Sequence, residues 1–157
     1  MTAPSAVRAP IDTGPVERWN PWAALRASSV ELWFAPLEGE RGRWIRHDGG
    51  DEILLDQALD RRARQEVLAH ELVHVERGVG WPHATAATME AEEERVWRTA
   101  LRRLAPPAEI RRFLARRGTV GPVTVADLAE EFDLSADAAA RVARLYAVTG
   151  ASADDDA

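Results

Sequence analysis

The chain contains no cysteine, which excludes disulfide bonds and metal sites built from thiolates. It has no apolar run approaching the roughly 18 residues that a membrane-spanning helix needs. Its first residues lack the charged start and apolar core of a secretory signal peptide. Because a reducing compartment is also compatible with the lack of cysteine, we expect a cytoplasmic protein that does not enter a membrane.

Basic residues are fewer than acidic residues in this chain. The chain has 26 acidic and 20 basic residues, a formal net charge of −6, which argues against nonspecific binding to nucleic acid. At 157 residues it is long enough for one compact domain with a real apolar core, with a small helical unit appended. Folding therefore does not require a metal on grounds of size.

Residues 70–74 read His-Glu-Leu-Val-His, which fits the HExxH pattern of zinc peptidases. On a helix, residues four apart lie one turn apart on the same face, so His70 and His74 can direct their imidazoles toward one metal ion. Glu71 lies beside them, where it can hold a metal-bound water and accept its proton. Zinc lowers the pKa of such a water to roughly 7, which makes hydroxide available at neutral pH.

The neighbouring residues predict the helix that this chemistry needs. Asp60 is a candidate N-cap, Gly78 is a candidate stop, and the stretch from Arg61 to Arg77 contains neither glycine nor proline. The alternative is an ordinary amphipathic helix with two partly buried histidines. The metzincin variant is excluded, because it needs glycine and histidine where this chain has Arg77 and Gly80.

A third metal ligand must come from another segment. The next predicted helix begins near residues 85–88, ends near Leu104 and carries four glutamates, most of which belong on a solvated face. At 100° per residue, Glu93 lies at the centre of its apolar stripe. That stripe consists of Met89, Val96, Trp97, Ala100 and Leu104. Because an unpaired buried carboxylate is costly, Glu93 is the predicted third ligand, in a His-His-Glu set with one open position. Glu90 and Glu92 are the alternatives.

The two remaining histidines are weaker candidates. His83 follows the HExxH helix in a predicted loop and could act as third ligand, and His47 lies in a predicted turn. For both, a solvated loop histidine is the simpler interpretation.

Three short segments, 30–34, 43–46 and 52–56, predict strands, and an Asp-Gly pair in the turn before the last one is a hairpin signal. We expect an α+β fold, with a small, mainly antiparallel sheet packed on the HExxH helix and on a second, ligand-bearing helix. The predicted organisation is a disordered arm (1–18), a metallopeptidase core (19–107), a C-terminal helical lobe (108–148) and a disordered acidic tail (149–157).

Within that lobe, the spacing of the last two predicted helices is typical of a helix-turn-helix. Only Arg141 and Arg144 of the second helix could reach DNA, and Glu130 and Glu131 would repel phosphate. The composition favours a packing or substrate-docking role over DNA binding.

Over roughly residues 30–147 the chain resembles the ImmA/IrrE-type metallopeptidase family. The resemblance rests on Ile-Leu-Leu-Asp at 53–56, the HExxH segment at 68–74, Leu-Ala-Pro at 104–106 and the segment 128–135. Glu-Arg-Gly at 76–78 and the Val96-Trp97 pair are similar to variants from actinobacteria and their phages.

The resemblance implies His70 and His74 as zinc ligands, Glu71 as the general base and a glutamate of the next helix as the third ligand. The family usually reads Glu-x-Glu-Ala-Asn in that helix, whereas residues 93–97 here read Glu-Glu-Arg-Val-Trp. The first glutamate, Glu93, is therefore kept, and the asparagine position is not. Family members cleave or antagonise transcriptional repressors, so a repressor is the implied protein partner.

We therefore expect a zinc-dependent endopeptidase that hydrolyses a peptide bond in a regulatory protein, with metal-bound water activated by Glu71. A non-proteolytic, zinc-containing anti-repressor is the main alternative. A DNA-binding regulator acting through the C-terminal helices is a weaker one.

Overall fold

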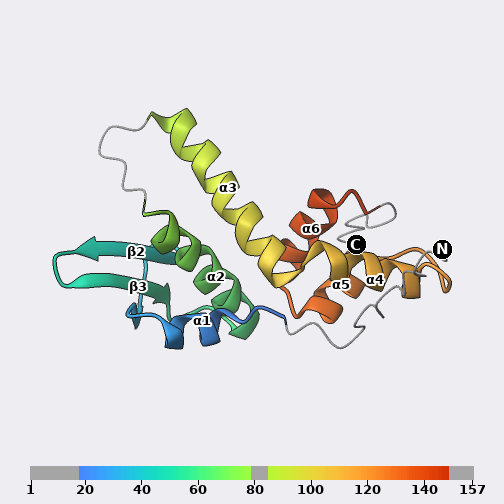
Figure 1. Cartoon of the computed structure of the whole chain (residues 1–157), viewed down its shortest axis with the longest axis horizontal. Helices are drawn as coiled ribbons and strands as arrows, with labels where there is room; N and C mark the ends of the chain where they lie inside the picture. Colours follow the sequence, from blue (N-terminus) through green and yellow to red (C-terminus); the bar gives the residue numbers. More distant parts are fainter. Residues whose placement is uncertain (1–17, 79–84, 149–157) are drawn as a thin grey trace, which may run out of the picture.

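A computed structural model of the chain describes residues 18–78 and 85–148 (Figure 1). These two ranges form six helices and a three-stranded sheet, so the predicted α+β class is confirmed. In chain order the elements are α1 (Pro21–Ala27), β1 (Glu31–Ala35), β2 (Gly42–His47), β3 (Gly50–Asp56), α2 (Arg61–Arg77), α3 (Ala86–Leu104), α4 (Pro107–Arg117), α5 (Val125–Phe132) and α6 (Ala136–Leu145). Apart from Arg18, the predicted arm and the predicted acidic tail lie outside the described residues.

None of the helices within these two ranges combines the length and the apolar character that crossing a membrane requires.

The sheet has the strand order β1-β3-β2. β1 runs parallel to β3, with Leu32 opposite Ile53, whereas β2 runs antiparallel to β3, with Trp44 opposite Ile53. The expectation of a mainly antiparallel sheet is therefore wrong, because the sheet is mixed. β3 takes the central position because it is the strand with fully buried apolar side chains, Ile53 and Leu55. Residues 36–41 connect β1 to β2, which lies on the opposite side of β3 from β1.

α2 begins and ends at the residues that its capping pattern predicts. The side chain of Asp60 accepts the backbone N–H of Ala63, and Gly78 ends the helix at a φ of 64°, which glycine adopts without strain. One face of α2 and the central strand share a buried apolar cluster. Its members are Ile53, Leu55, Val67, Leu68 and Leu72.

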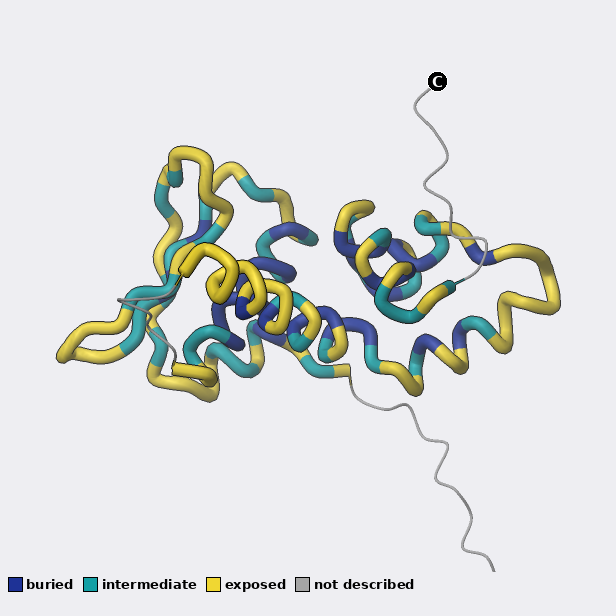
Figure 2. The backbone as a smooth tube through the Cα atoms, turned by 90° about the horizontal axis from the view of Figure 1, so that it is seen from above, coloured by how far each residue is buried: buried dark blue, intermediate teal, exposed yellow. Residues whose placement is uncertain are grey.

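A second, larger apolar cluster includes Ala69 and Val73 of α2, Val96 and Ala100 of α3, and residues of α4, α5 and α6. Figure 2 shows buried backbone where α2 and α3 meet and again among the C-terminal helices. The first turns of α3 extend beyond this cluster. Met89, expected in the buried stripe, is consequently 54% exposed, since no described element covers these turns.

Glu66 connects α2 to the C-terminal helices. It is 1% exposed, and its carboxylate accepts the backbone N–H of Ser135 at 2.5 Å and the hydroxyl of Ser135 at 2.8 Å. Burial raises the pKa of Glu66, and the two hydrogen bonds from Ser135 act in the opposite direction. Because Ser135 is the N-cap of α6, this contact anchors α6 to the helix that carries the HExxH motif.

Replacing Glu66 with alanine is expected to lower the free energy of unfolding by about 2–3 kcal/mol, because it removes a buried side chain and leaves two partly buried polar groups of Ser135 without this partner. Glu130→Ala is the matched control. The Glu130 side chain is 76% exposed in its ion pair with Arg62, so its loss should change stability by less than about 0.5 kcal/mol. Urea unfolding followed by circular dichroism measures both variants, and equal losses would contradict the anchoring role.

Candidate metal centre

Two helices bring three potential metal ligands to one point. His70 and His74 lie one turn apart on α2, and Glu93 reaches them from α3. Glu93 Oε2 lies 3.1 Å from His70 Nε2, Glu93 Oε1 lies 3.0 Å from His74 Nε2, and the two Nε2 atoms are 3.0 Å apart. The three ligand atoms all lie within 4.8 Å of one another, so a single ion between them reaches all three.

This centre is closed on the α2 side and open on the α3 side. The His70 side chain is 7% exposed and that of His74 is 16% exposed, whereas the Glu93 side chain is 52% exposed. Within the described residues, three potential ligands thus meet at a centre with access from solvent. Catalytic zinc sites have three protein ligands and an open position, whereas structural sites are closed.

The pKa shifts of His70 and Glu93 suit metal binding, whereas that of His74 favours a proton that a metal ion would have to displace. Burial lowers the pKa of His70, which favours the neutral imidazole. Hydrogen bonds from His70 and His74 hold the pKa of Glu93 far below its usual range, so Glu93 is a carboxylate. Burial alone would lower the pKa of His74, but the hydrogen bond to Glu93 and the charges of Glu93 and Glu71 outweigh it and raise that pKa. A neutral imidazole and an ionised carboxylate are the forms that ligate metals.

The donor set fits a divalent transition metal. Two imidazole nitrogens and a carboxylate oxygen are the ligands of many catalytic zinc sites, and they suit neighbouring metals as well. Ligating histidines usually donate their second ring N–H to a carboxylate or carbonyl. His70 Nδ1 is buried and has no hydrogen-bond partner within the described part of the chain. The ring of His70 is therefore held by packing. The three donor atoms are compatible with several divalent transition metals and do not select one element.

Two tryptophans, one from a predicted strand and one from the predicted apolar stripe of α3, provide this packing. The ring of Trp97 lies 4.3 Å from that of His70, and Trp44 stacks at 6.3 Å from His74. Trp97 follows Glu93 by four residues on α3, so helical spacing alone could have placed it beside the ligands. Its ring contacts the candidate ligand His70. Trp44 lies on β2, and no local signal predicted its position.

Glu71 lies beside the three ligands and is 5% exposed. Burial raises the pKa of Glu71 to about 7, with the charge of His74 opposing this rise and that of Glu93 adding to it. β2 packs closely against it. A Cβ atom added to Gly42 would lie 2.4 Å from Val67 Cγ1 and 3.0 Å from Glu71 Oε1, so only glycine fits here without displacing these side chains.

The other predicted ligands lie elsewhere. Glu92 is buried, but its carboxylate pairs with the guanidinium of Arg77, with Nη2 at 2.9 Å, and Glu90 is exposed. His47 is exposed at the end of β2, where it lies 3.0 Å from a glutamate of β3. His83 lies outside the described residues. Among the described histidines and carboxylates, the structure thus brings together His70, His74 and Glu93.

No protein-family model matches the chain, and no curated protein matches it. The interpretation of the site therefore depends on its own residues and geometry.

Wild-type protein is expected to bind one zinc ion per chain, and His70→Ala and Glu93→Ala are each expected to weaken binding by at least about tenfold, because each removes a ligand atom. Competition with a chromophoric chelator, followed by elemental analysis, measures this. Glu90→Ala is the control, since it removes an exposed carboxylate from the same helix and should leave affinity unchanged. If Glu93→Ala binds zinc as well as Glu90→Ala does, the third ligand is another residue.

Proposed function

We propose that this protein is a zinc-dependent endopeptidase, resembling the ImmA/IrrE type, that hydrolyses a peptide bond in a regulatory protein. One observation carries the proposal: a buried acid with a pKa of about 7, Glu71, adjoins a three-ligand centre that opens to solvent. Burying these groups costs free energy that a merely structural helix would avoid. Strongly shifted pKa values in an accessible site are typical of catalysis.

In the proposed mechanism, His70, His74 and Glu93 would hold the ion, each through one ligand atom. A bound zinc ion supplies Lewis acidity, which makes a water molecule more acidic and polarises the scissile carbonyl. Glu71 accepts a proton from the attacking water near neutral pH and then donates it to the nitrogen of the leaving amine.

Support for the position of Glu71 comes from β2. The backbone N–H of Trp44 bonds to its carboxylate, and Gly42 leaves no free space beside it. In this proposal, the small sheet packs on the HExxH helix as the platform that orients the general base. Close contact with this strand restricts the orientation of the carboxylate while it gains and loses a proton.

The proposed substrate is a transcriptional repressor or a similar regulatory protein, on the basis of the family resemblance. Such a substrate would place the reaction in the cytoplasm. An extended polypeptide would approach from the α3 side, where Glu93 is half exposed while both histidines are covered.

A non-proteolytic anti-repressor with a structural zinc site is the competing interpretation. Structural zinc sites are usually closed by four protein ligands. Within residues 18–78 and 85–148, three ligands meet and one of them faces solvent, which favours the catalytic interpretation.

Glu71→Gln is expected to reduce cleavage by about 10²–10⁴-fold, because the amide cannot accept the proton, and to leave zinc binding intact. Cleavage of β-casein and of a panel of purified repressors, followed by mass spectrometry, measures this. Glu76→Gln provides the control on the same helix, since Glu76 is exposed and pairs with Arg103. Cleavage by Glu71→Gln at the wild-type rate would contradict the mechanism. Zinc binding without cleavage of any substrate, but with repressor binding, would favour the anti-repressor.

A further inference from the structure

Two neighbouring hollows lead away from the proposed metal centre along α3. The nearer one, of about 570 Å³, is lined by Glu93, Trp97 and Arg141 among others. The farther one, of about 580 Å³, lies between α3 and α6 and shares Trp97 and Arg141 with the first. Because Trp97 also contacts His70, a chain lying along both hollows would end at the proposed centre.

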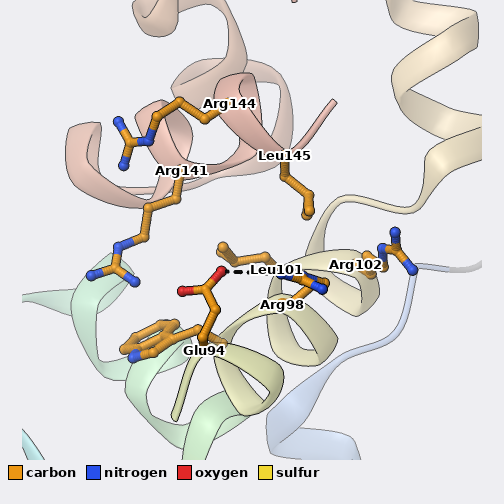
Figure 3. A pocket seen from close by; sticks show the side chains of 8 residues that line it. Glu94, Arg98, Leu101, Arg102, Arg141, Arg144 and Leu145 are labelled. Atoms are coloured by element: carbon orange, nitrogen blue, oxygen red, sulfur yellow. Dashed lines mark ion pairs between the residues drawn. The ribbon is translucent and has the colours of Figure 1, made fainter. Parts of the chain in front are cut away.

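The farther hollow is lined by four arginines and one glutamate (Figure 3). Arg98 and Arg102 belong to α3, and Arg141 and Arg144 come from α6 on the opposite side. The glutamate, Glu94, lies 3.6 Å from Arg98. Four positive charges against one negative charge leave an excess of three positive charges in a chain whose net charge is −6.

Three of these arginines have no carboxylate partner in the part of the chain that the structure describes. Within the described ranges, no carboxylate lies within 4.0 Å of the guanidinium groups of Arg102, Arg141 and Arg144. The guanidinium of Arg141 instead lies 5.1 Å from the centre of the Trp97 ring. Four guanidinium groups facing one hollow repel one another unless an anion lies between them.

The presence of arginine rather than lysine in this hollow carries no information, because all 20 basic residues of this chain are arginines. The informative feature is that four arginines line one hollow. Elsewhere, neighbouring arginines surround a carboxylate of the chain, as Arg61 and Arg62 surround Asp133 and as Arg18 and Arg116 share Glu131. Among the described residues, the hollow between α3 and α6 has the arginines of such a cluster without the corresponding carboxylates.

We propose that this hollow, the arginine groove, binds an acidic segment of the protein substrate. The proposal rests on the proposed endopeptidase function and adds the feature by which the enzyme selects its substrate. Guanidinium groups form paired, charge-assisted hydrogen bonds with carboxylates. The groove is the place in the described structure where such groups adjoin the centre.

Helix geometry predicts where the acidic residues lie in the substrate. Along the axis of α3, at 1.5 Å per residue, Arg98 and Arg102 follow Glu93 by about 7.5 and 13.5 Å, and at 100° per residue they lie about 140° and 180° around the helix from it. For a helix about 10–12 Å across with its side chains, the separations are roughly 13 and 17 Å, which an extended peptide covers in about four and five residues. Aspartate or glutamate is therefore expected within about five residues of the cleaved bond.

The surroundings favour a peptide over nucleic acid. Glu90, Glu94 and Asp137 line this hollow or the hollows next to it. A phosphate backbone carries a charge at every nucleotide and would meet these carboxylates. A peptide can place its carboxylates at the arginines and neutral residues beside the glutamates.

Fluorescence polarisation with the full-length Glu71→Gln protein tests the proposal, because this variant should hold a peptide uncut. The probes are a labelled peptide rich in glutamate and aspartate, the same peptide with glutamine and asparagine instead, and a labelled DNA duplex. We expect the acidic peptide to bind at least about tenfold more tightly than its amide counterpart. Arg102→Glu/Arg144→Glu should lose about tenfold or more, and Arg102→Gln/Arg144→Gln should lose part of that.

Arg26→Glu/Arg111→Glu is the matched control, because it makes the same change in net charge at two exposed arginines on α1 and α4. It should keep its affinity within about twofold, since long-range effects are screened by salt. Equal binding of both peptides, or equal losses in the groove and control variants, would overturn the proposal. Tighter binding of DNA through the same arginines would overturn it in favour of a nucleic-acid site.

Cleavage assays separate this proposal from the proposed function. Acidic peptide bound through the groove arginines, without any cleavage by wild type, would support the groove and refute the endopeptidase. Cleavage of neutral and acidic substrates at equal rates, unaffected by Arg102→Glu/Arg144→Glu, would support the endopeptidase and refute the groove.

Discussion

The burial of ionisable groups in the middle of α2 constrains the whole structure. Residues 66–73 are all buried, and three of them carry ionisable side chains. Each finds its partner on a different element: Glu66 at the start of α6, His70 at Glu93 of α3, and Glu71 at the backbone of β2. Because an unpartnered buried charge costs several kcal/mol, these three contacts fix the sheet, α3 and the C-terminal helices around one helix.

Local signals predicted what depends on a single helix. Asp60 and Gly78 bounded α2, and the periodicity of α3 selected Glu93 from four glutamates. The same periodicity wrongly placed Met89 in the core. Periodicity identifies the apolar face of a helix but does not show how far along that face a neighbouring element covers it. The strand order was missed for a related reason. Pairing depends on which strand buries the most apolar surface against α2, and the hairpin signal before β3 says nothing about β1.

Residues from distant segments give the site its character. Gly42 of β2 lies close to Glu71, and Trp44 of the same strand stacks on His74. Trp97 of α3 packs on His70. The two tryptophan rings pack on the histidines, and the centre is exposed on the side of Glu93. The open side leads along α3 to arginines of α6, whose N-cap is held by Glu66 of α2. In the proposed endopeptidase, the C-terminal helices would thereby be part of the surface that a substrate meets.

X-ray absorption spectroscopy at the zinc edge, on protein loaded with one equivalent of zinc, tests the metal centre most directly. The structure predicts a shell of nitrogen and oxygen atoms at roughly 2.0–2.1 Å, with the multiple-scattering signature of two imidazoles and at least one carboxylate oxygen. A shell of oxygen atoms alone, without imidazole scattering, would show that His70 and His74 do not hold the ion and would contradict the site.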